Sequence, residues 1–202
     1  METQMDIIGV TVLDGGTKAR IERAAVDRFA SKGVDAVTTR EIAAVAGISE
    51  GALYRHFKSK AELAQTLFRT IHETLADEIT AVSSADLRIE ENAAAIVQAY
   101  CRAADNDWAL FTYHLLNTHR FLPALAASDN QPRKNPVAQV EAIIAGAMDQ
   151  GEIKRGDANL KAALCLGVVL QAALHKVYGK LLEPMSHYET ELTRAVNAVL
   201  HS

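Results

Sequence analysis

One stretch of the chain, residues 38–63 (TTREIAAVAGISEGALYRHFKSKAEL), restricts the fold more than any other. Thr38 is followed three residues later by Glu41, which is the spacing of a capping box at a helix start. Gly47 then interrupts the helical pattern and can adopt the left-handed conformation that a tight turn requires. Ser49 can cap a second short helix. The stretch therefore predicts two short helices that meet at a glycine-containing turn.

The residues around this turn divide into an inner and an outer face. In the second short helix, Leu53 and Phe57 lie one turn apart on one face, whereas Tyr54 and Arg55 point elsewhere. A further capping box at residues 59–62 opens a longer helix. This is the geometry of a helix-turn-helix, whose second helix enters the major groove of DNA. The side chains expected in the core of this segment are Ile42, Val45, Leu53 and Phe57.

The same stretch resembles the DNA-binding signature of the TetR/AcrR family of bacterial transcriptional regulators, and the match runs without a gap from Thr39 to Leu63. The resemblance implies an all-α fold. It consists of an N-terminal three-helix DNA-binding head with a helix-turn-helix and a C-terminal helical body for ligand binding and dimerisation. The matching residues are Thr39, Arg40, Glu41, Ile42, Ala43, Ala46, Gly47, Ser49, Gly51, Leu53, Tyr54, His56, Phe57, Lys60 and Leu63.

The resemblance also implies a set of DNA contacts. Tyr54 and His56 look like the family's phosphate-contacting pair, and residues 50–52 face the groove in family members. Arg55 can pair bidentately with guanine or hold a phosphate. A solvated helix surface is the alternative reading for each of these side chains. The predicted DNA-binding residues are Lys18, Thr39, Arg40, Ser49, Glu50, Gly51, Ala52, Tyr54, Arg55, His56 and Lys60.

The charge of the chain is unevenly distributed. The 202 residues carry a formal net charge of −4, which by itself argues against a nucleic-acid partner. Between Thr17 and Lys60, however, nine basic residues face five acidic ones, a net charge of +4 that leaves −8 for the remainder. A basic head on an acidic body suits a protein that contacts phosphates with one end only.

Helical periodicity and its interruptions organise the rest of the chain, in which we find no convincing strand. We expect a flexible arm at residues 1–16, a DNA-binding domain at 17–60 and a ligand-binding and dimerisation domain at 61–202. Thr17 and Ser186 are the expected caps of the first and last helices, Pro123 should end or kink a helix, and residues 127–136 should form a loop. The expected helices span 18–32, 60–81, 87–104, 108–120, 137–150, 157–182 and 186–200, besides the two short ones.

The predicted helix at residues 157–182 is apolar or small at nearly every position from Ala162 to Leu174. A helix that is apolar all round must be covered all round. A surrounding domain or a second chain would satisfy this requirement, and no apolar run reaches the roughly 18 residues of a membrane-spanning helix. The TetR resemblance implies that the last two long helices pair with those of a partner in a four-helix bundle, so we expect a homodimer.

Aromatic side chains cluster in the middle of the predicted body. They indicate a ligand pocket with a few polar groups, although ordinary core is the alternative reading for each residue. Few acids lie among them, which favours an apolar or neutral ligand. The predicted ligand-binding residues are Tyr100, Trp108, Phe111, His114 and Leu115.

Other chemistries find little support in the sequence. Cys101 and Cys165 fit neither a disulfide framework nor a metal cluster, and the seven histidines form no ligand-spaced group. We therefore expect no metal and no cofactor, and a reducing, cytoplasmic location. An all-α enzyme is the rival class, but no nucleophile–base arrangement supports it. We predict a ligand-responsive repressor that binds palindromic operator DNA as a homodimer; the alternative is an activator, or a repressor without a small-molecule effector.

Overall fold

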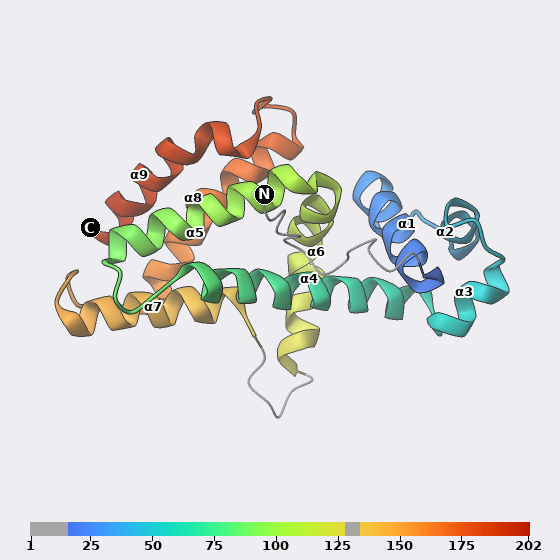
Figure 1. Cartoon of the computed structure of the whole chain (residues 1–202), viewed down its shortest axis with the longest axis horizontal. Coiled ribbons are helices and arrows are strands. Elements are labelled where there is room, and N and C mark those ends of the chain that lie inside the picture. Colours follow the sequence, from blue (N-terminus) through green and yellow to red (C-terminus); the bar gives the residue numbers. More distant parts are fainter. Residues whose placement is uncertain (1–15, 128–133) are drawn as a thin grey trace, which may run out of the picture. The chain divides into compact units, whose positions relative to one another are not determined.

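The computed structural model describes residues 16–127 and 134–202, and every regular element in these ranges is a helix (Figure 1). The all-α prediction is therefore confirmed. Most of the predicted arm and of the loop predicted at 127–136 lies outside the described residues. The elements are α1 (Thr17–Lys32), α2 (Thr39–Val45), α3 (Glu50–His56), α4 (Lys60–Val82), α5 (Ile89–Asn106), α6 (Trp108–Ala127), α7 (Pro136–Gln150), α8 (Ala158–Val177), a 3₁₀ helix (Met185–Tyr188) and α9 (Glu189–Leu200).

The described chain divides into two compact units, residues 16–74 with 107–127 and residues 75–106 with 134–202. The helix α4 is continuous and contributes to both. The helix α6, which we assigned to the body at 61–202, packs on α1 in the first unit.

Aromatic packing explains why α6 joins the first unit. The ring of Tyr113 on α6 is fully buried and lies 5.7 Å from the ring of Phe29 on α1. Its hydroxyl donates a hydrogen bond of 2.6 Å to the carbonyl oxygen of Ala64 on α4. A large aromatic side chain with a satisfied hydroxyl contributes strongly to a core. The helix does not end at Pro123, which was one of the two predicted outcomes, but continues to Ala127.

A second buried cluster joins α4 to α6 within the same unit. The ring of Phe68 stacks on the imidazole of His114, with centroids 4.7 Å apart. The Nδ1 atom of His72 lies 3.1 Å from the Nε2 atom of His114, a hydrogen bond between two imidazoles. Burial, and then the nearby His72, lower the pKa of His114 to about 3. These contacts hold two elements together that are about forty residues apart in sequence.

The second unit is a bundle in which α7 packs on α8, α8 on α9 and α9 on α5. The ammonium group of Lys161 on α8 donates to the carbonyl oxygens of Val199 (3.1 Å) and Leu200 (3.0 Å), and so satisfies the C-terminal end of α9. Ser186 does not cap the last helix as predicted, because α9 begins later, at Glu189. The backbone N–H of Ser186 instead donates to the carboxylate of Asp105 (2.9 Å).

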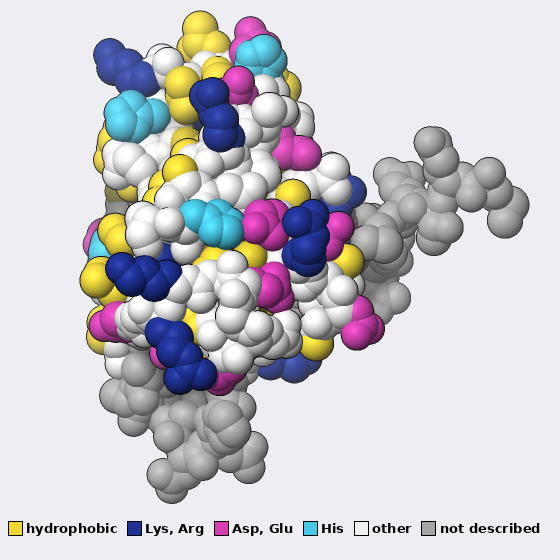
Figure 2. Space-filling model, turned by 90° about the vertical axis from the view of Figure 1, so that its left-hand side faces the viewer, with side chains coloured by type: hydrophobic (Ala, Val, Ile, Leu, Met, Phe, Trp, Pro, Cys, Tyr) yellow, Lys and Arg dark blue, Asp and Glu magenta, His cyan; other side chains and the backbone are white. Residues whose placement is uncertain are grey.

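The rest of the chain covers only a small part of the apolar surface of α8. It has 20 residues, and an 18-residue window within it has a mean hydropathy of 1.5, so by length and composition alone it could cross a membrane. Only 22% of the residues in this window are buried. Leu160 and Leu164 are 56% and 51% exposed. Viewed from the left of Figure 1, the molecule instead shows basic, acidic and apolar side chains interspersed (Figure 2). The exposed leucines of α8 therefore require a separate explanation.

Candidate nucleic-acid interface

The helix α2 begins with the predicted capping box. The Oγ1 atom of Thr38 accepts a hydrogen bond from the backbone N–H of Glu41 (3.2 Å), and the backbone N–H of Thr38 donates to the carboxylate of Glu41 (2.8 Å). The ammonium group of Lys32 lies 3.0 Å from the same carboxylate. The bond from the Thr38 backbone, with help from Lys32, lowers the pKa of Glu41 to about 2. The carboxylate therefore remains charged at neutral pH, where it stabilises the helix start.

The turn between α2 and α3 also follows the sequence prediction. Gly47 has a φ angle of 66°, a conformation that strains other residues. The backbone N–H of Ile48 donates a hydrogen bond to the carbonyl oxygen of Ala43 (3.0 Å). The side chain of Ser49 caps α3 by accepting from the backbone N–H of Ala52 (3.2 Å). Local sequence signals thus fix the angle at which α3 leaves the turn.

The helix α3 is anchored by its inner face and exposes its outer one. Leu53 and Phe57 are 0% and 4% exposed. Tyr54, Arg55 and His56 are all exposed. A seven-residue helix could not hold this shape alone. The buried pair therefore holds the helix so that these three polar side chains remain exposed.

A polar cluster links the starts of α2 and α3. The hydroxyl of Thr39 donates to the carboxylate of Glu50 (2.5 Å) and lies 3.3 Å from the hydroxyl of Tyr54. Thr39 and Glu50 are half-buried. Three of the predicted DNA-binding residues therefore contact one another directly. The carboxylate of Glu50 therefore already has a hydrogen-bond partner within the protein.

Lys60 is also engaged within the protein. Its ammonium group donates to the carbonyl oxygens of Val37 (2.6 Å) and Asp35 (3.1 Å) in the segment between α1 and α2. The carboxylate of Asp35 is held in turn by a bidentate pair with Arg120 of α6, with both distances 2.8 Å. An ammonium group has three donors, so one remains for a phosphate.

Two sequence assignments in this segment are wrong. Ala52, which we placed on the groove-facing side, is only 8% exposed, because its position on α3 turns it toward the inner face with Leu53. Val45, which we placed in the core, is 47% exposed at the last position of α2, whose buried residues are Ile42 and Ala43. The other predicted residues keep an outward position: Lys18, Arg40, Ser49, Gly51, Tyr54, Arg55 and His56 are exposed.

The segment that builds this surface has relatives among known proteins. Residues 21–67 match the sequence model of the family described as "Bacterial regulatory proteins, tetR family". The HTH-type transcriptional regulator TtgR of Pseudomonas putida is 47% identical over 58 residues, which make up 29% of this chain and 28% of that protein. The match thus spans little more than a quarter of the relative's length.

Solved structures extend the likeness to most of the chain. The fatty acid degradation regulator FadR from Bacillus halodurans aligns with a TM-score of 0.75 at 19% identity, covering 90% of this chain and 95% of that one. FadR from Bacillus subtilis in complex with stearoyl-CoA aligns with a TM-score of 0.67, also at 19% identity, covering 90% and 98%. Residues 21–67 therefore carry the DNA-binding segment of the TetR family of bacterial transcriptional regulators. At these identities the structural likeness shows the fold alone.

The five residues predicted to form a TetR-type ligand pocket are divided between the two units. Tyr100 lies half-buried on α5 in the second unit, and burial raises its pKa far above the ordinary value. The other four lie on α6 in the first unit. Trp108 and Phe111 stack with ring centroids 5.7 Å apart, and Phe111 is buried, as is Leu115. Their contacts within the first unit are those of packed core side chains.

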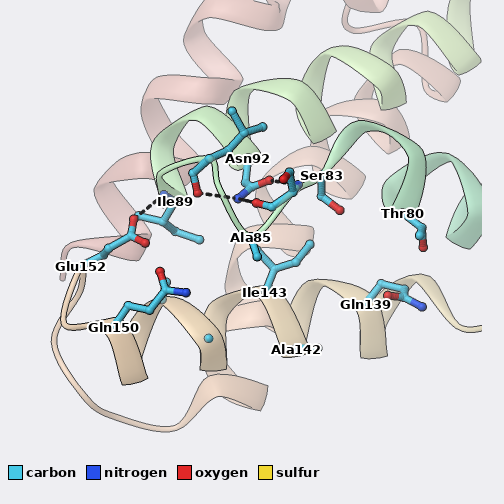
Figure 3. A pocket seen from close by; sticks show the side chains of 14 residues that line it. Thr80, Ser83, Ala85, Ile89, Asn92, Gln139, Ala142, Ile143, Gln150 and Glu152 are labelled. Carbon is cyan, nitrogen blue, oxygen red and sulfur yellow. Dashed lines mark hydrogen bonds between the residues drawn. The ribbon is translucent and has the colours of Figure 1, made fainter.

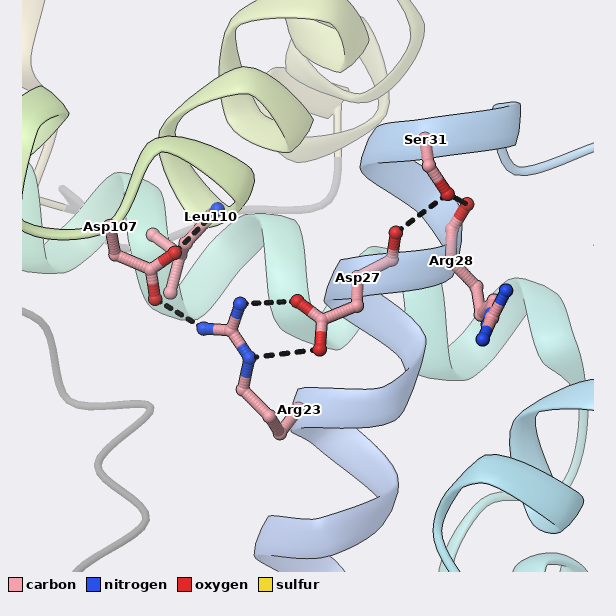
Figure 4. A network of polar contacts seen from close by, with 6 residues as sticks. All are labelled: Arg23, Asp27, Arg28, Ser31, Asp107 and Leu110. Atoms are coloured by element: carbon pink, nitrogen blue, oxygen red, sulfur yellow. Dashed lines mark hydrogen bonds and ion pairs between the residues drawn. The ribbon is translucent and has the colours of Figure 1, made fainter.

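The structure also reveals polar contacts that sequence spacing did not predict. The guanidinium of Arg23 on α1 pairs with Asp27 on its own helix and with Asp107 at the start of α6 (Figure 4). Asp107 accepts as well from the backbone N–H of Leu110 (3.0 Å), which caps α6. The contact with Asp107 joins residues 84 positions apart, and no local pattern signals it. It fixes α6 to the helix that supports the DNA-binding face.

Proposed function

We propose that this protein is a cytoplasmic, dimeric repressor of the TetR family. It binds palindromic operator DNA through α3 and releases it when a small molecule binds in the helical body. The exposed triad Tyr54, Arg55 and His56, presented by a short helix with a buried inner face, carries the proposal. An exposed α-helix of this size fits the major groove.

Electrostatics support the DNA-binding part. The net charge of +4 between Thr17 and Lys60 contrasts with −8 for the rest. Arg40 and Lys18 are exposed near the starts of α2 and α1. Backbone N–H groups and basic side chains at helix starts attract phosphates. A phosphate can therefore be held at several points around the base-reading helix.

The exposed apolar surface of α8 supports the dimer. Leu160 and Leu164 lie one turn apart and are each about half exposed. Apolar area of this kind marks a site of association, and a two-fold dimer presents two copies of α3 to half-sites about 34–36 Å apart. Pairing through α8 would bury these leucines and supply the symmetry that a palindrome requires.

The family fold and the helix α4 support an effector. FadR from Bacillus subtilis, a structural relative, binds stearoyl-CoA. In this chain α4 is one continuous helix of 23 residues, held at its first residue by the carbonyl groups between α1 and α2. An effector that prefers one position of α4 would shift the population toward the conformer that fits DNA less well.

A titration of DNA tests the proposal. The full-length protein is titrated onto fluorescent duplexes from the DNA upstream of its own gene. The variant is Arg55→Ala. The matched control is Arg155→Ala, because the side chain of Arg155 is 78% exposed and lies in the second unit. We expect Arg55→Ala to weaken binding by about 5- to 150-fold, the value of a base or phosphate contact of 1–3 kcal/mol. Equal affinities of the two variants would refute the role of α3.

A further inference from the structure

The second unit contains a hollow of about 320 Å³ between the end of α4, the residues that join α4 to α5, and α7 (Figure 3). None of its lining residues is Lys, Arg or His. Most of the polar groups are neutral amides and hydroxyls, and the one ionisable side chain is the carboxylate of Glu152. The hollow lies at the lower end of the usual size range for small-molecule sites.

Hydrogen bonds hold the walls of this hollow in place. The buried amide of Asn92 accepts from the backbone N–H of Ser84 (3.0 Å) and donates to the carbonyl oxygens of Ser84 (2.9 Å) and Leu87 (3.1 Å). On the opposite side, one carboxylate oxygen of Glu152 accepts from the backbone N–H of Ile89 (2.6 Å). The segment between α4 and α5 is therefore fixed by side chains, so the hollow is formed before any ligand arrives.

Other polar groups on its wall have no partner in the part of the chain that the structure describes. They are the side-chain amides of Gln139 and Gln150 and the second carboxylate oxygen, Oε1, of Glu152. The two glutamines stand toward either end of the α7 segment, with Ala142 between them (Figure 3). Gly146 lies on the same face, and a Cβ atom built there meets nothing within 4 Å. Small residues thus leave room between polar groups at the two ends.

We propose that this hollow is the effector site and that the effector is a small hydrophilic amine. Its ammonium group pairs with Glu152, and its hydroxyl or amide groups bond to Gln139 and Gln150. Only the word effector depends on the proposed function, whereas the site and the chemical class of its ligand do not. An anion would face a carboxylate with no basic residue in the lining, and an apolar molecule would cover the polar groups of Gln139 and Glu152 without bonding to them. The ligand class therefore differs from the acyl-CoA bound by the Bacillus subtilis relative.

The location of the hollow allows a bound ligand to influence the DNA-binding helices through α4. Thr80 lies in the last turn of α4 and Ser83 directly follows that helix. A ligand bound here contacts the same continuous helix whose first residue, Lys60, holds the segment before α2. A preference for one position of α4 is sufficient to couple the two ends.

Three probes of matched shape test the ligand class. They are Tris, pentaerythritol and 2,2-bis(hydroxymethyl)propionate, which share hydroxymethyl groups on one carbon and differ in carrying a cation, no charge or an anion. Each is titrated at pH 7 onto the full-length protein with labelled methyl groups, and the Ala142 and Ile143 signals are followed by NMR. We expect saturable shifts with Tris at concentrations at least tenfold lower than with pentaerythritol, and none with the carboxylate. Shifts of equal size with the carboxylate, or none with any probe, would overturn the proposal.

Variants locate the binding. Glu152→Gln retains an acceptor for the Ile89 N–H and should remove the tenfold preference for Tris. Gly146→Leu fills the hollow and should abolish the shifts, whereas Gly146→Ala is the control that leaves most of the space open. Unchanged Tris binding in both Glu152→Gln and Gly146→Leu would contradict the site. Because these titrations contain no DNA, a failure of DNA binding would refute the proposed function and leave the site standing.

Discussion

The helices α3 and α8 both leave large side chains uncovered, and they differ in the chemistry that they expose. Tyr54 on α3 is 49% exposed and Leu164 on α8 is 51% exposed, so the degree of exposure does not distinguish them. The neighbours of Tyr54 are Arg55 and His56, whereas the neighbours of Leu164 include alanines and another exposed leucine. A polar, partly basic face suits phosphates and base edges. An apolar face suits a second protein surface. This difference supports the proposal that α3 contacts nucleic acid and that α8 contacts a second copy of the chain.

The largest expected effect comes from placing a charge on the apolar helix. Leu164→Glu should give a monomer and weaken operator binding by at least roughly 100-fold, because an unpaired charge in an interface costs several kcal/mol. Sedimentation velocity measures the mass, and the DNA titration measures the affinity. Lys154→Glu, at an exposed position between α7 and α8 in the same unit, is the control. A dimer of unchanged stability would show that α8 is not the interface.

A smaller effect concerns the imidazole pair that joins α4 to α6. The folded protein keeps His114 neutral, with its pKa lowered to about 3 by burial and by His72, whereas an unfolded chain takes up the proton near pH 6.5. Stability from this group is therefore complete above about pH 6.5 and is lost as the pH falls toward 3. Between pH 6.5 and 5 the free energy of unfolding should drop by at most about 2 kcal/mol.

The variant His114→Gln tests this dependence, because its amide can still bond to His72 but does not titrate. Urea unfolding at pH 7.5 and pH 5.0 should give a smaller difference for His114→Gln than for the unsubstituted protein. His119→Gln, on the exposed side of α6, should behave like the unsubstituted protein. The same loss of stability in all three proteins would contradict the assignment. Glu41 does not contribute to this difference in the folded protein, because its pKa is lowered to about 2 and its carboxylate stays charged at both pH 7.5 and pH 5.0.

The smallest effect concerns the hydroxyl that joins α6 to α4. Tyr113→Phe removes the donor to the carbonyl oxygen of Ala64 and should cost about 1–2 kcal/mol without altering the buried ring. Thermal unfolding should shift by roughly 2–8 °C. Tyr188→Phe, whose hydroxyl makes only an exposed bond of 3.4 Å, is the matched control. Equal shifts for both variants would show that the α4–α6 contact contributes little.

Local signals made the DNA-binding face predictable from the sequence. Capping by Thr38 and Ser49 and the positive φ angle of Gly47 depend on residues within a few positions of one another. The inner pair Leu53 and Phe57 follows from helical periodicity alone. The structure therefore agrees with the sequence on which side of α3 faces outward, with Ala52 the exception at the edge between the two faces.

Contacts between distant residues could not be predicted in the same way. Ser186 stands three residues before Glu189, which is the spacing of a capping box. Its backbone N–H instead donates to the carboxylate of Asp105, some eighty positions earlier. Arg120 and Asp35 form a bidentate pair over a similar separation. The aromatic residues of α6 resembled a pocket, yet Phe111 and Leu115 are buried. Periodicity shows that a face is apolar but not which element covers it.

The central claim is that two copies of the chain bind one duplex through α3. Native mass spectrometry of the protein mixed with a palindromic duplex from its own upstream DNA measures this stoichiometry directly. We predict two chains per duplex, or a multiple of two, and a clearly smaller fraction of bound duplex when Arg55→Ala replaces the unsubstituted protein under the same conditions. A single chain per duplex, or an undiminished complex with Arg55→Ala, would contradict the account.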